Sequence, residues 1–195
     1  MATEVLDEAT EQGLTRRRAT IEEFWSLPES VLPAEYINGE IIMAPTPTPA
    51  HQTVSMVLSA HLHQFVSRAG LGRMFPAPLD VILPTGEVVQ PDIFLLTPKQ
   101  AARALAEKRV YEVPVFVVEI LSPGTASHDM ITKRELYEKN GVREYWIVDV
   151  KERGIAQLVL RKKRYVVSEH GEADAIRSAV LEGFEMKVGE LIGLG

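Results

Sequence analysis

Apolar and polar positions alternate along the chain with a period that switches several times between helical and extended. From 50 to 69 the apolar residues recur at helical spacing, which predicts an amphipathic helix that ends near Gly70. The run from 115 to 121 is the most apolar of the chain and predicts a strand buried on both faces. Because strands and helices follow one another in mixed order, we expect an α/β fold in which helices flank one central mixed sheet.

Turn and capping residues place the other elements. Thr20 and Glu23 form a capping-box pattern for a short helix, and Asn38-Gly39 predicts a turn between two strands over 35–44. Residues 1–19 carry no sustained apolar period, so we expect a flexible lead-in before a single domain over 20–195. Further strands are expected at 73–76, 79–83, 88–96, 144–150, 155–160 and 165–168, and further helices from Pro98 and over 127–140.

The composition is that of a globular protein and excludes several kinds of site. Of the 195 residues 46% are hydrophobic and none is cysteine, which excludes a disulfide scaffold, a thiolate zinc site and a cysteine nucleophile. No apolar run approaches the length of a membrane span, and the first residues lack the apolar core of a secretory signal. We therefore expect a cytoplasmic protein with no membrane partner.

The net charge of −6, from 21 basic and 27 acidic residues, argues against tight coating of nucleic acid, because proteins that do so are usually basic. A transient encounter with nucleic acid through a local basic patch stays open. Two basic runs occur, at 16–18 and at 161–164, and both are more typical of solvated surface. The second lies between two strand-like runs, which predicts a hairpin turn.

Two acidic residues lie where the pattern predicts the core. Glu119 is inside the strand at 115–121, and Asp92 is inside the apolar run at 88–96. A buried carboxylate without a partner is costly, so such groups are usually paired, metal-bound or protonated. If the two strands are neighbours, ionised carboxylates about 5 Å apart repel by roughly 3 kcal/mol at an effective dielectric constant near 20. A cation between them would remove that cost.

A lysine on the next helix supplies a third buried charge. At 100° per residue Lys133 falls at the centre of the inward face of 127–140, flanked by apolar side chains that include Met130. Two simpler interpretations stay open: Asp129 and Lys133 form only an i,i+4 ion pair, and Asp92 only caps a turn. Two core acids and an inward lysine together favour a divalent cation and a water positioned for phosphodiester hydrolysis.

Other polar residues are weaker candidates. Glu40 begins the strand after the Asn-Gly turn, where an ordinary exposed acid is an equally good interpretation. His51 points inward at the start of the long helix, although inward histidines are more often hydrogen-bonded packing residues than ligands. His61 is expected in the core, and the remaining three histidines are expected to be exposed or in linking segments: His63, His128 and His170. No serine elbow or phosphate-binding glycine loop occurs.

Several stretches, taken in order, resemble the Uma-type restriction endonuclease family of the PD-(D/E)xK nuclease superfamily over residues 20 to 192. They are Glu35-Tyr-Ile-Asn-Gly-Glu40, Ala50-His51-Gln52, Pro91-Asp92, Val118-Glu119-Ile-Leu-Ser122-Pro123, the set Asp129, Lys133 and Tyr137, and Gly141-Val-Arg-Glu-Tyr-Trp-Ile-Val-Asp149. The resemblance implies a restriction-endonuclease-like fold, a Mg²⁺ or Mn²⁺ site, and hydrolytic cleavage of nucleic acid, with DNA as the expected substrate.

The resemblance also implies roles for individual residues. Asp92 matches the aspartate of the motif and Glu119 its second acid, and both are expected to bind the metal. Glu40 matches a leading acid, with Glu35 as its rival. The superfamily lysine normally stands two residues after the second acid, where this chain has Leu121, and Lys133 is expected to replace it. The expected supporting residues are His51, Asp129, Tyr137 and Glu35.

Two other functions compete with the endonuclease. One is a catalytically silent module of the same fold that binds or regulates as a dimer, which the acidic charge favours. The other is a metal-dependent hydrolase of a smaller phosphoester. A two-fold homodimer is the oligomer we expect, because it is the commonest one.

Overall fold

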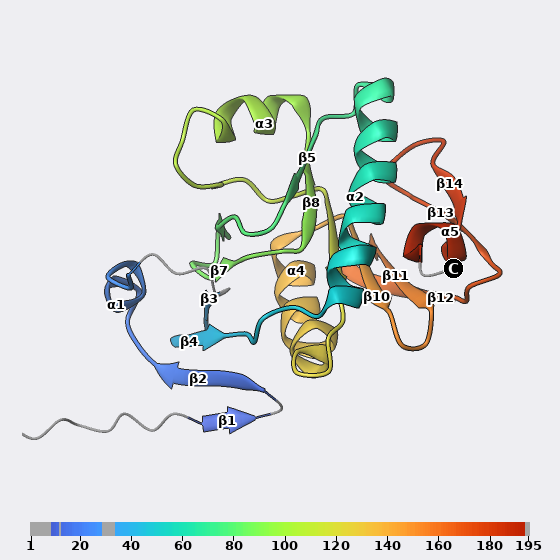
Figure 1. Cartoon of the computed structure of the whole chain (residues 1–195). Coiled ribbons are helices and arrows are strands. Elements are labelled where there is room, and N and C mark those ends of the chain that lie inside the picture. The colour runs from blue at the N-terminus through green and yellow to red at the C-terminus, as the bar shows by residue number, and fades with distance from the viewer. Residues whose placement is uncertain (1–8, 12, 29–33, 194–195) are drawn as a thin grey trace, which may run out of the picture.

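The computed structural model describes residues 9–11, 13–28 and 34–193, and two six-stranded sheets form the body of this part of the chain (Figure 1). The N-terminal sheet has the strand order β1-β2-β4-β3-β7-β6, and all its pairs are antiparallel. Its strands are β1 (Ala9–Glu11), β2 (Leu14–Arg18), β3 (Ala34–Ile37), β4 (Glu40–Met43), β6 (Val81–Ile82) and β7 (Val88–Val89).

The central sheet is mixed and has the order β12-β11-β10-β9-β8-β5. Strands β9 and β10 are parallel, and the other pairs are antiparallel. Its strands are β5 (Arg73–Pro76), β8 (Ile93–Leu96), β9 (Phe116–Ile120), β10 (Glu144–Asp149), β11 (Gly154–Arg161) and β12 (Arg164–His170). A small hairpin pairs β13 (Ala175–Arg177) with β14 (Glu185–Lys187).

Helices cover both faces of the central sheet, which confirms the predicted fold class. On one face the long helix α2 and the C-terminal helix α5 share a core cluster with strands of the central sheet. On the other face α4, α3 and the N-terminal sheet share a second cluster with it. The helical elements are α1 (Ile21–Trp25), α2 (Pro49–Ala69), α3 (Pro98–Ala104), the π-helix η1 (His128–Lys133), α4 (Arg134–Asn140) and α5 (Val188–Ile192).

Local sequence signals set the bounds of α1, α2 and the β3–β4 hairpin as predicted. Thr20 and Glu23 form the reciprocal capping box of α1. Helix α2 ends at Gly70, whose φ of 64° is left-handed and favours glycine. Asn38 and Gly39 have φ values of 53° and 79°, so both occupy the left-handed region that a two-residue hairpin turn requires.

The stretch at 88–96 is not one strand, and this prediction is wrong. Gln90, Pro91 and Asp92 separate β7, in the N-terminal sheet, from β8, in the central sheet. Pro91 has no N–H to give to a ladder, so the apolar run is interrupted there and the chain crosses between sheets. Asp92 therefore lies at the seam between the two sheets, immediately before β8.

The part of 1–19 that the structure describes contains two strands, where the sequence predicts a flexible lead-in. Residues 14–18 form β2, which pairs with β4 and joins β1 to the N-terminal sheet. Pairing with β4 supplies the backbone partners, so the segment forms a strand without a long apolar period of its own. Residues 1–8 and 12 lie outside the described residues, and the prediction stays untested there.

The predicted helix at 127–140 begins as a π-helix, and its inward face differs from the prediction. His128 is buried although it was expected to be exposed or linking, whereas Met130, expected on the inward face, is 49% exposed. A π-helix has more residues per turn than the 3.6 of an α-helix, so a helical wheel built for an α-helix misplaces side chains in η1. The predicted burial of Lys133 still holds, since it is 5% exposed.

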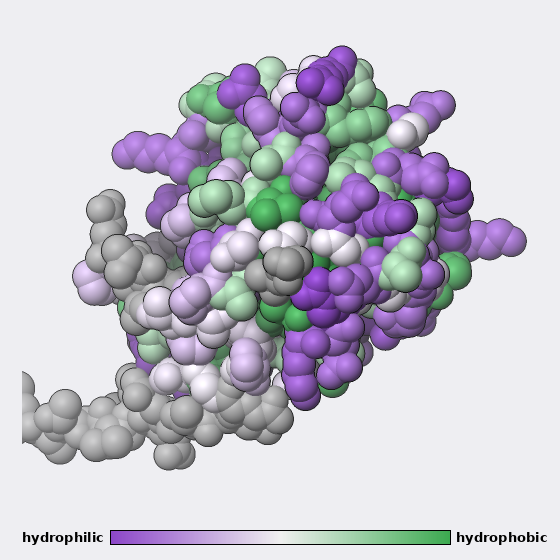
Figure 2. All heavy atoms as spheres, turned by 45° about the vertical axis from the view of Figure 1, so that its right-hand side comes forward, coloured by the Kyte–Doolittle hydropathy of each residue, from purple (hydrophilic) through white to green (hydrophobic). Residues whose placement is uncertain are grey.

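The surface in Figure 2 is covered mainly by hydrophilic residues, with smaller hydrophobic areas between them. The basic run at 161–164 forms the predicted hairpin turn between β11 and β12. Within the described part of the chain, no helix combines the length and the apolar character needed to cross a membrane.

Candidate active site

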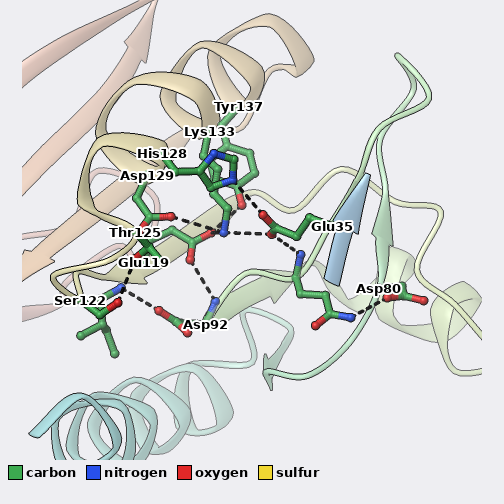
Figure 3. A network of polar contacts seen from close by, with 12 residues as sticks. Glu35, Asp80, Asp92, Glu119, Ser122, Thr125, His128, Asp129, Lys133 and Tyr137 are labelled. Atoms are coloured by element: carbon green, nitrogen blue, oxygen red, sulfur yellow. Dashed lines mark hydrogen bonds and ion pairs between the residues drawn. The ribbon is translucent and has the colours of Figure 1, made fainter. Parts of the chain in front are cut away.

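A cavity of about 220 Å³ lies where the two sheets meet, and charged side chains from both line it. Glu35 comes from β3 of the N-terminal sheet, and Glu119 comes from β9 of the central sheet. Asp92 precedes β8, and Asp129 and Lys133 come from η1. Figure 3 shows these side chains pointing toward one another from elements that are far apart in the sequence.

Lys133 is at the centre of the cluster (Figure 3). Its Nζ atom lies 2.9 Å from Glu35 Oε1, 3.0 Å from Glu119 Oε1 and 3.4 Å from Asp129 Oδ1. Burial opposes the charged form of this lysine, but the three carboxylates outweigh it and raise the pKa of Lys133 well above its usual value. The ammonium therefore stays charged and serves as the internal counter-ion of the cluster.

Glu119 has an excess of negative charge around it. Its Oε1 atom accepts hydrogen bonds from Lys133 Nζ at 3.0 Å and from Tyr137 Oη at 2.7 Å, and its side chain is almost fully buried. Burial raises the pKa of Glu119 well above its usual value, and the charges of Asp129 and Asp92 act in the same direction against the opposing charge of Lys133. One lysine thus does not neutralise this cluster of carboxylates.

Asp92 is fixed by one of its two carboxylate oxygens. Oδ2 accepts from the Ile120 backbone N–H at 2.8 Å and pairs with His51 Nε2 at 3.1 Å. Burial lowers the pKa of His51, but the hydrogen bond to Asp92 together with the charges of Asp92 and Asp129 outweighs it, so the net shift of the pKa is upward. No described residue forms a hydrogen bond or ion pair with Asp92 Oδ1, and Asp92 lines the cavity. The backbone N–H of Asp92 lies 3.4 Å from Glu119 Oε2, so the two acids adjoin.

Glu35 connects Lys133 to residues that sequence patterns do not single out. Its Oε1 atom accepts from Lys133 and from the backbone N–H of Gln90 at 2.8 Å. Its Oε2 atom is 3.0 Å from His128 Nε2. Burial alone would raise the pKa of Glu35, but Lys133 and His128 lower it from 4.5 to about 2. This carboxylate is therefore ionised throughout the neutral range.

Sequence reasoning misplaces Glu40 and His128. Glu40 is not among the residues that line the cavity; its half-exposed side chain pairs with Arg16 at 3.7 Å. Glu35, its rival for the leading acid, occupies the site instead. His128 was expected to be exposed or linking, yet it is 3% exposed and contacts Glu35. Its burial depends on the π-helical turn, for which the sequence carries no signal that we can identify.

Another buried acid, Glu144, shows what a carboxylate needs when no cation is near. This side chain is fully buried and accepts five hydrogen bonds of 2.7–2.9 Å from neutral donors. The donors are Trp146 Nε1, Gln157 Nε2, Ser178 Oγ and the backbone N–H groups of Ala179 and Val180. The acids of the cavity have fewer neutral donors, so they depend on positive charge.

The donor chemistry of the cavity fits a hard divalent cation. Mg²⁺ is commonly held by one or two carboxylates, with water and substrate phosphate completing its coordination. Asp92 and Glu119 both line the cavity, where negative charge is in excess, and Asp92 Oδ1 is left without a protein partner in the described part of the chain. No group of three or more His, Cys, Asp or Glu side chains there is arranged to hold a metal. These two residues would therefore supply only part of a coordination shell.

Comparison with known proteins shows the family of this chain and its fold. A family model described as "Putative restriction endonuclease", Uma2, matches residues 21–189. The chain therefore belongs to the Uma2 family, as its sequence predicts. A search of curated proteins finds none that matches.

A solved structure shows the fold. The crystal structure of a protein from Anabaena variabilis, described as a putative nuclease belonging to DUF820, has a TM-score of 0.78 to this chain at 20% sequence identity. The match covers 89% of this chain and 97% of that one. The predicted restriction-endonuclease-like fold, with its mixed central sheet flanked by helices, is confirmed.

Proposed function

We propose that this protein is a metal-dependent endonuclease that hydrolyses phosphodiester bonds of nucleic acid. The observation that supports this most strongly is the position of Lys133. Its buried ammonium touches Glu119, and Glu119 adjoins Asp92 in a cavity at the seam of the two sheets. The family match agrees with such an activity. Mg²⁺ or Mn²⁺, bound by Asp92 and Glu119, would supply a Lewis acid and lower the pKa of a bound water.

The residues of the chain have separate tasks in this proposal. Lys133 orients the attacking water and offsets the negative charge that develops on the phosphate in the transition state. Glu35 and Tyr137 hold the Lys133–Glu119 pair in place through their contacts with Nζ and Oε1. His51 orients Asp92 through Oδ2, so that the other oxygen faces the cavity.

The substrate we propose is DNA, bound transiently in the cytoplasm. The net charge of −6 disfavours a long-lived complex held by many phosphate contacts. We also propose a two-fold homodimer, since a pair of sites related by such an axis suits the two antiparallel strands of a duplex.

A plasmid-nicking assay combined with metal titration tests the proposal. Supercoiled DNA should be nicked with Mg²⁺ or Mn²⁺ and stay intact with a chelator. Calorimetry should detect the binding of either ion to wild type and not to Asp92→Asn or Glu119→Gln. Glu40→Gln is the matched control, because it removes an acid outside the cavity. Metal binding without cleavage of DNA, RNA or a small phosphoester would refute the nuclease assignment.

A catalytically silent binding module is the second candidate, and one observation favours it. Lys133 already lies among the carboxylates and takes the place of a counter-ion, so the cluster is partly neutralised without metal. In that case neither Mg²⁺ nor Mn²⁺ binds, and Lys133 serves stability alone. The same titration decides between the two functions.

A further inference from the structure

A chain of contacts leads from strand β2 into the site. The Nη2 atom of Arg16 lies 3.4 Å from His128 Nδ1. On the other side of the ring, His128 Nε2 lies 3.0 Å from Glu35 Oε2, and Glu35 Oε1 lies 2.9 Å from Lys133 Nζ. Arg16 is N-terminal to the stretch that the family model matches, which begins at residue 21.

The two neighbours of the His128 ring select one protonation state. A guanidinium has only hydrogen-bond donors, so Nδ1, which faces Arg16, must be an acceptor. An ionised carboxylate only accepts, so Nε2 must carry the proton and donate to Glu35. In the other neutral tautomer, Nδ1–H would face the guanidinium of Arg16, which is donor against donor, and Nε2 would face Glu35 Oε2, which is acceptor against acceptor. A doubly protonated ring would set Nδ1–H against the guanidinium.

We propose that Arg16 is a positioning residue of the active site: by donating to Nδ1 it holds the His128 ring in the orientation in which Nε2–H meets Glu35 beside Lys133. Because His128 is only 3% exposed, water does not readily replace the Arg16 guanidinium as the donor to Nδ1. The inference rests on the proposed function, because it assigns a role within the same site.

Apart from its contact with His128, the side chain of Arg16 makes few favourable interactions. Its Nε atom is buried and has no hydrogen-bond partner among the described residues. Its ion pair with the half-exposed Glu40 is long, at 3.7 Å. A buried donor without a partner is costly, so apart from its contact with His128 the side chain of Arg16 gains little stability where it lies.

Fixing the Glu35 carboxylate determines where Lys133 lies. When His128 donates to Oε2, the other oxygen is directed to Lys133 Nζ and to the Gln90 N–H. If the ring turns away, Oε2 loses its donor, and only the contacts of Oε1 with Lys133 and the Gln90 N–H hold the carboxylate. Arg16 thus acts on cleavage through three intervening groups and touches neither metal nor substrate.

Histidine-selective ¹⁵N NMR at neutral pH tests the proposal directly. The chain has five histidines, and the signals of His128 are identified by their loss in His128→Asn. The informative variant is Arg16→Met, which keeps a linear stem and removes the donors. Arg17→Met is the matched control, since it removes the same charge from the next position, whose side chain points to the other face of β2.

In wild type and in Arg17→Met, we expect a protonated Nε2 and an unprotonated Nδ1. In Arg16→Met the Nδ1 shift should change because Nδ1 loses its donor, and the ring loses one of the two contacts that orient it. Cleavage should then fall by about tenfold, as when an outer-shell partner is removed. Arg16→Gln, whose side chain is too short to reach the ring, should give the same result as Arg16→Met. It replaces Arg16→Met in the test if that variant does not fold.

A wild-type His128 that is doubly protonated or protonated at Nδ1 would overturn the inference, as would ring ¹⁵N shifts that are unchanged in both Arg16 variants. Changed ring shifts with undiminished cleavage would overturn the positioning role. If wild type cleaves no nucleic acid at all, the proposed function fails. The spectra still decide whether Arg16 holds the His128 ring.

Discussion

The Nζ atom of Lys133 lies 3.0 Å from Oε1 of Glu119, although Lys133 ends the π-helix η1 and Glu119 lies inside strand β9. The contact sets a lysine beside the second acid of the site even though Leu121 occupies the position two residues after Glu119. The charge therefore reaches the site by packing of a helix onto the sheet rather than along the strand.

Removal of the Lys133 ammonium should abolish most cleavage. We expect Lys133→Met to lower single-turnover nicking by about 100-fold or more, the effect of losing one electrostatic stabiliser of the transition state. Lys139→Met, which changes a lysine elsewhere on the same helical segment, is the control and should cleave normally. If Lys133 serves only its ion pair with Asp129, Asp129→Asn and Lys133→Met will cost similar stability and leave nicking intact.

Divalent metal should stabilise the folded protein. Because a ligand that binds only the native state adds about 2.7 kcal/mol when present at 100 times its Kd, excess Mn²⁺ should raise the Tm. We expect no rise in the double variant Asp92→Asn/Glu119→Gln and a normal rise in Glu40→Gln. Differential scanning calorimetry measures this, and equal Tm values for wild type in Mn²⁺ and in chelator would contradict the metal site.

The ion pair of Glu35 should make stability depend on pH in the acid range. The pKa of Glu35 is lowered from 4.5 to about 2, so its carboxylate stabilises the fold above about pH 4.5. This contribution, about 3 kcal/mol for such a shift, is lost as the pH falls through that range. Urea unfolding should therefore show a gap between wild type and Glu35→Gln that is full at neutral pH and closes near pH 2. A gap that stays constant would show that Glu35 keeps an ordinary pKa.

Glu144 should matter for stability and not for chemistry. In wild type the Glu144 carboxylate accepts five hydrogen bonds. Glu144→Gln replaces one of its oxygens with an amide N–H₂ group, which faces those same donors. We expect a loss of about 3 kcal/mol in the free energy of unfolding, since buried donors are left without an acceptor. Chemical denaturation measures the loss, with the exposed Glu152→Gln as control. Reduced cleavage by the fully folded variant would contradict a purely structural role.

Much of the fold follows from local signals. The helix at 49–69 has an apolar period, a capping threonine and a terminal Gly70, and the β3–β4 hairpin has Asn38-Gly39 at its turn. These signals act between near neighbours in the chain, so a sequence pattern contains them. The crossing at Pro91 was missed because both halves of 88–96 are apolar, and only pairing with distant strands assigns them to different sheets.

The site was predictable to the extent that its charges interrupt apolar runs. Asp92 and Glu119 stand out in this way, and a helical wheel turns Lys133 inward. The wheel fails for His128, because η1 has a wider turn than the wheel assumes. The contact of Arg16 was not predicted for a different reason. Arg16 lies in a basic run that is typical of solvated surface, and only the fold brings β4 and His128 beside it.

The chain passes from one sheet to the other over the three residues Gln90, Pro91 and Asp92. Asp92 is thereby tethered to β7 on one side and hydrogen-bonded to β9 on the other, while Glu35 belongs wholly to the N-terminal sheet. The distances among these carboxylates therefore depend on the relative position of the two sheets. In the proposed function, a substrate that draws these acids together would hold the two sheets together across the seam. A displacement of one sheet relative to the other would misalign the groups that are proposed to act on the substrate.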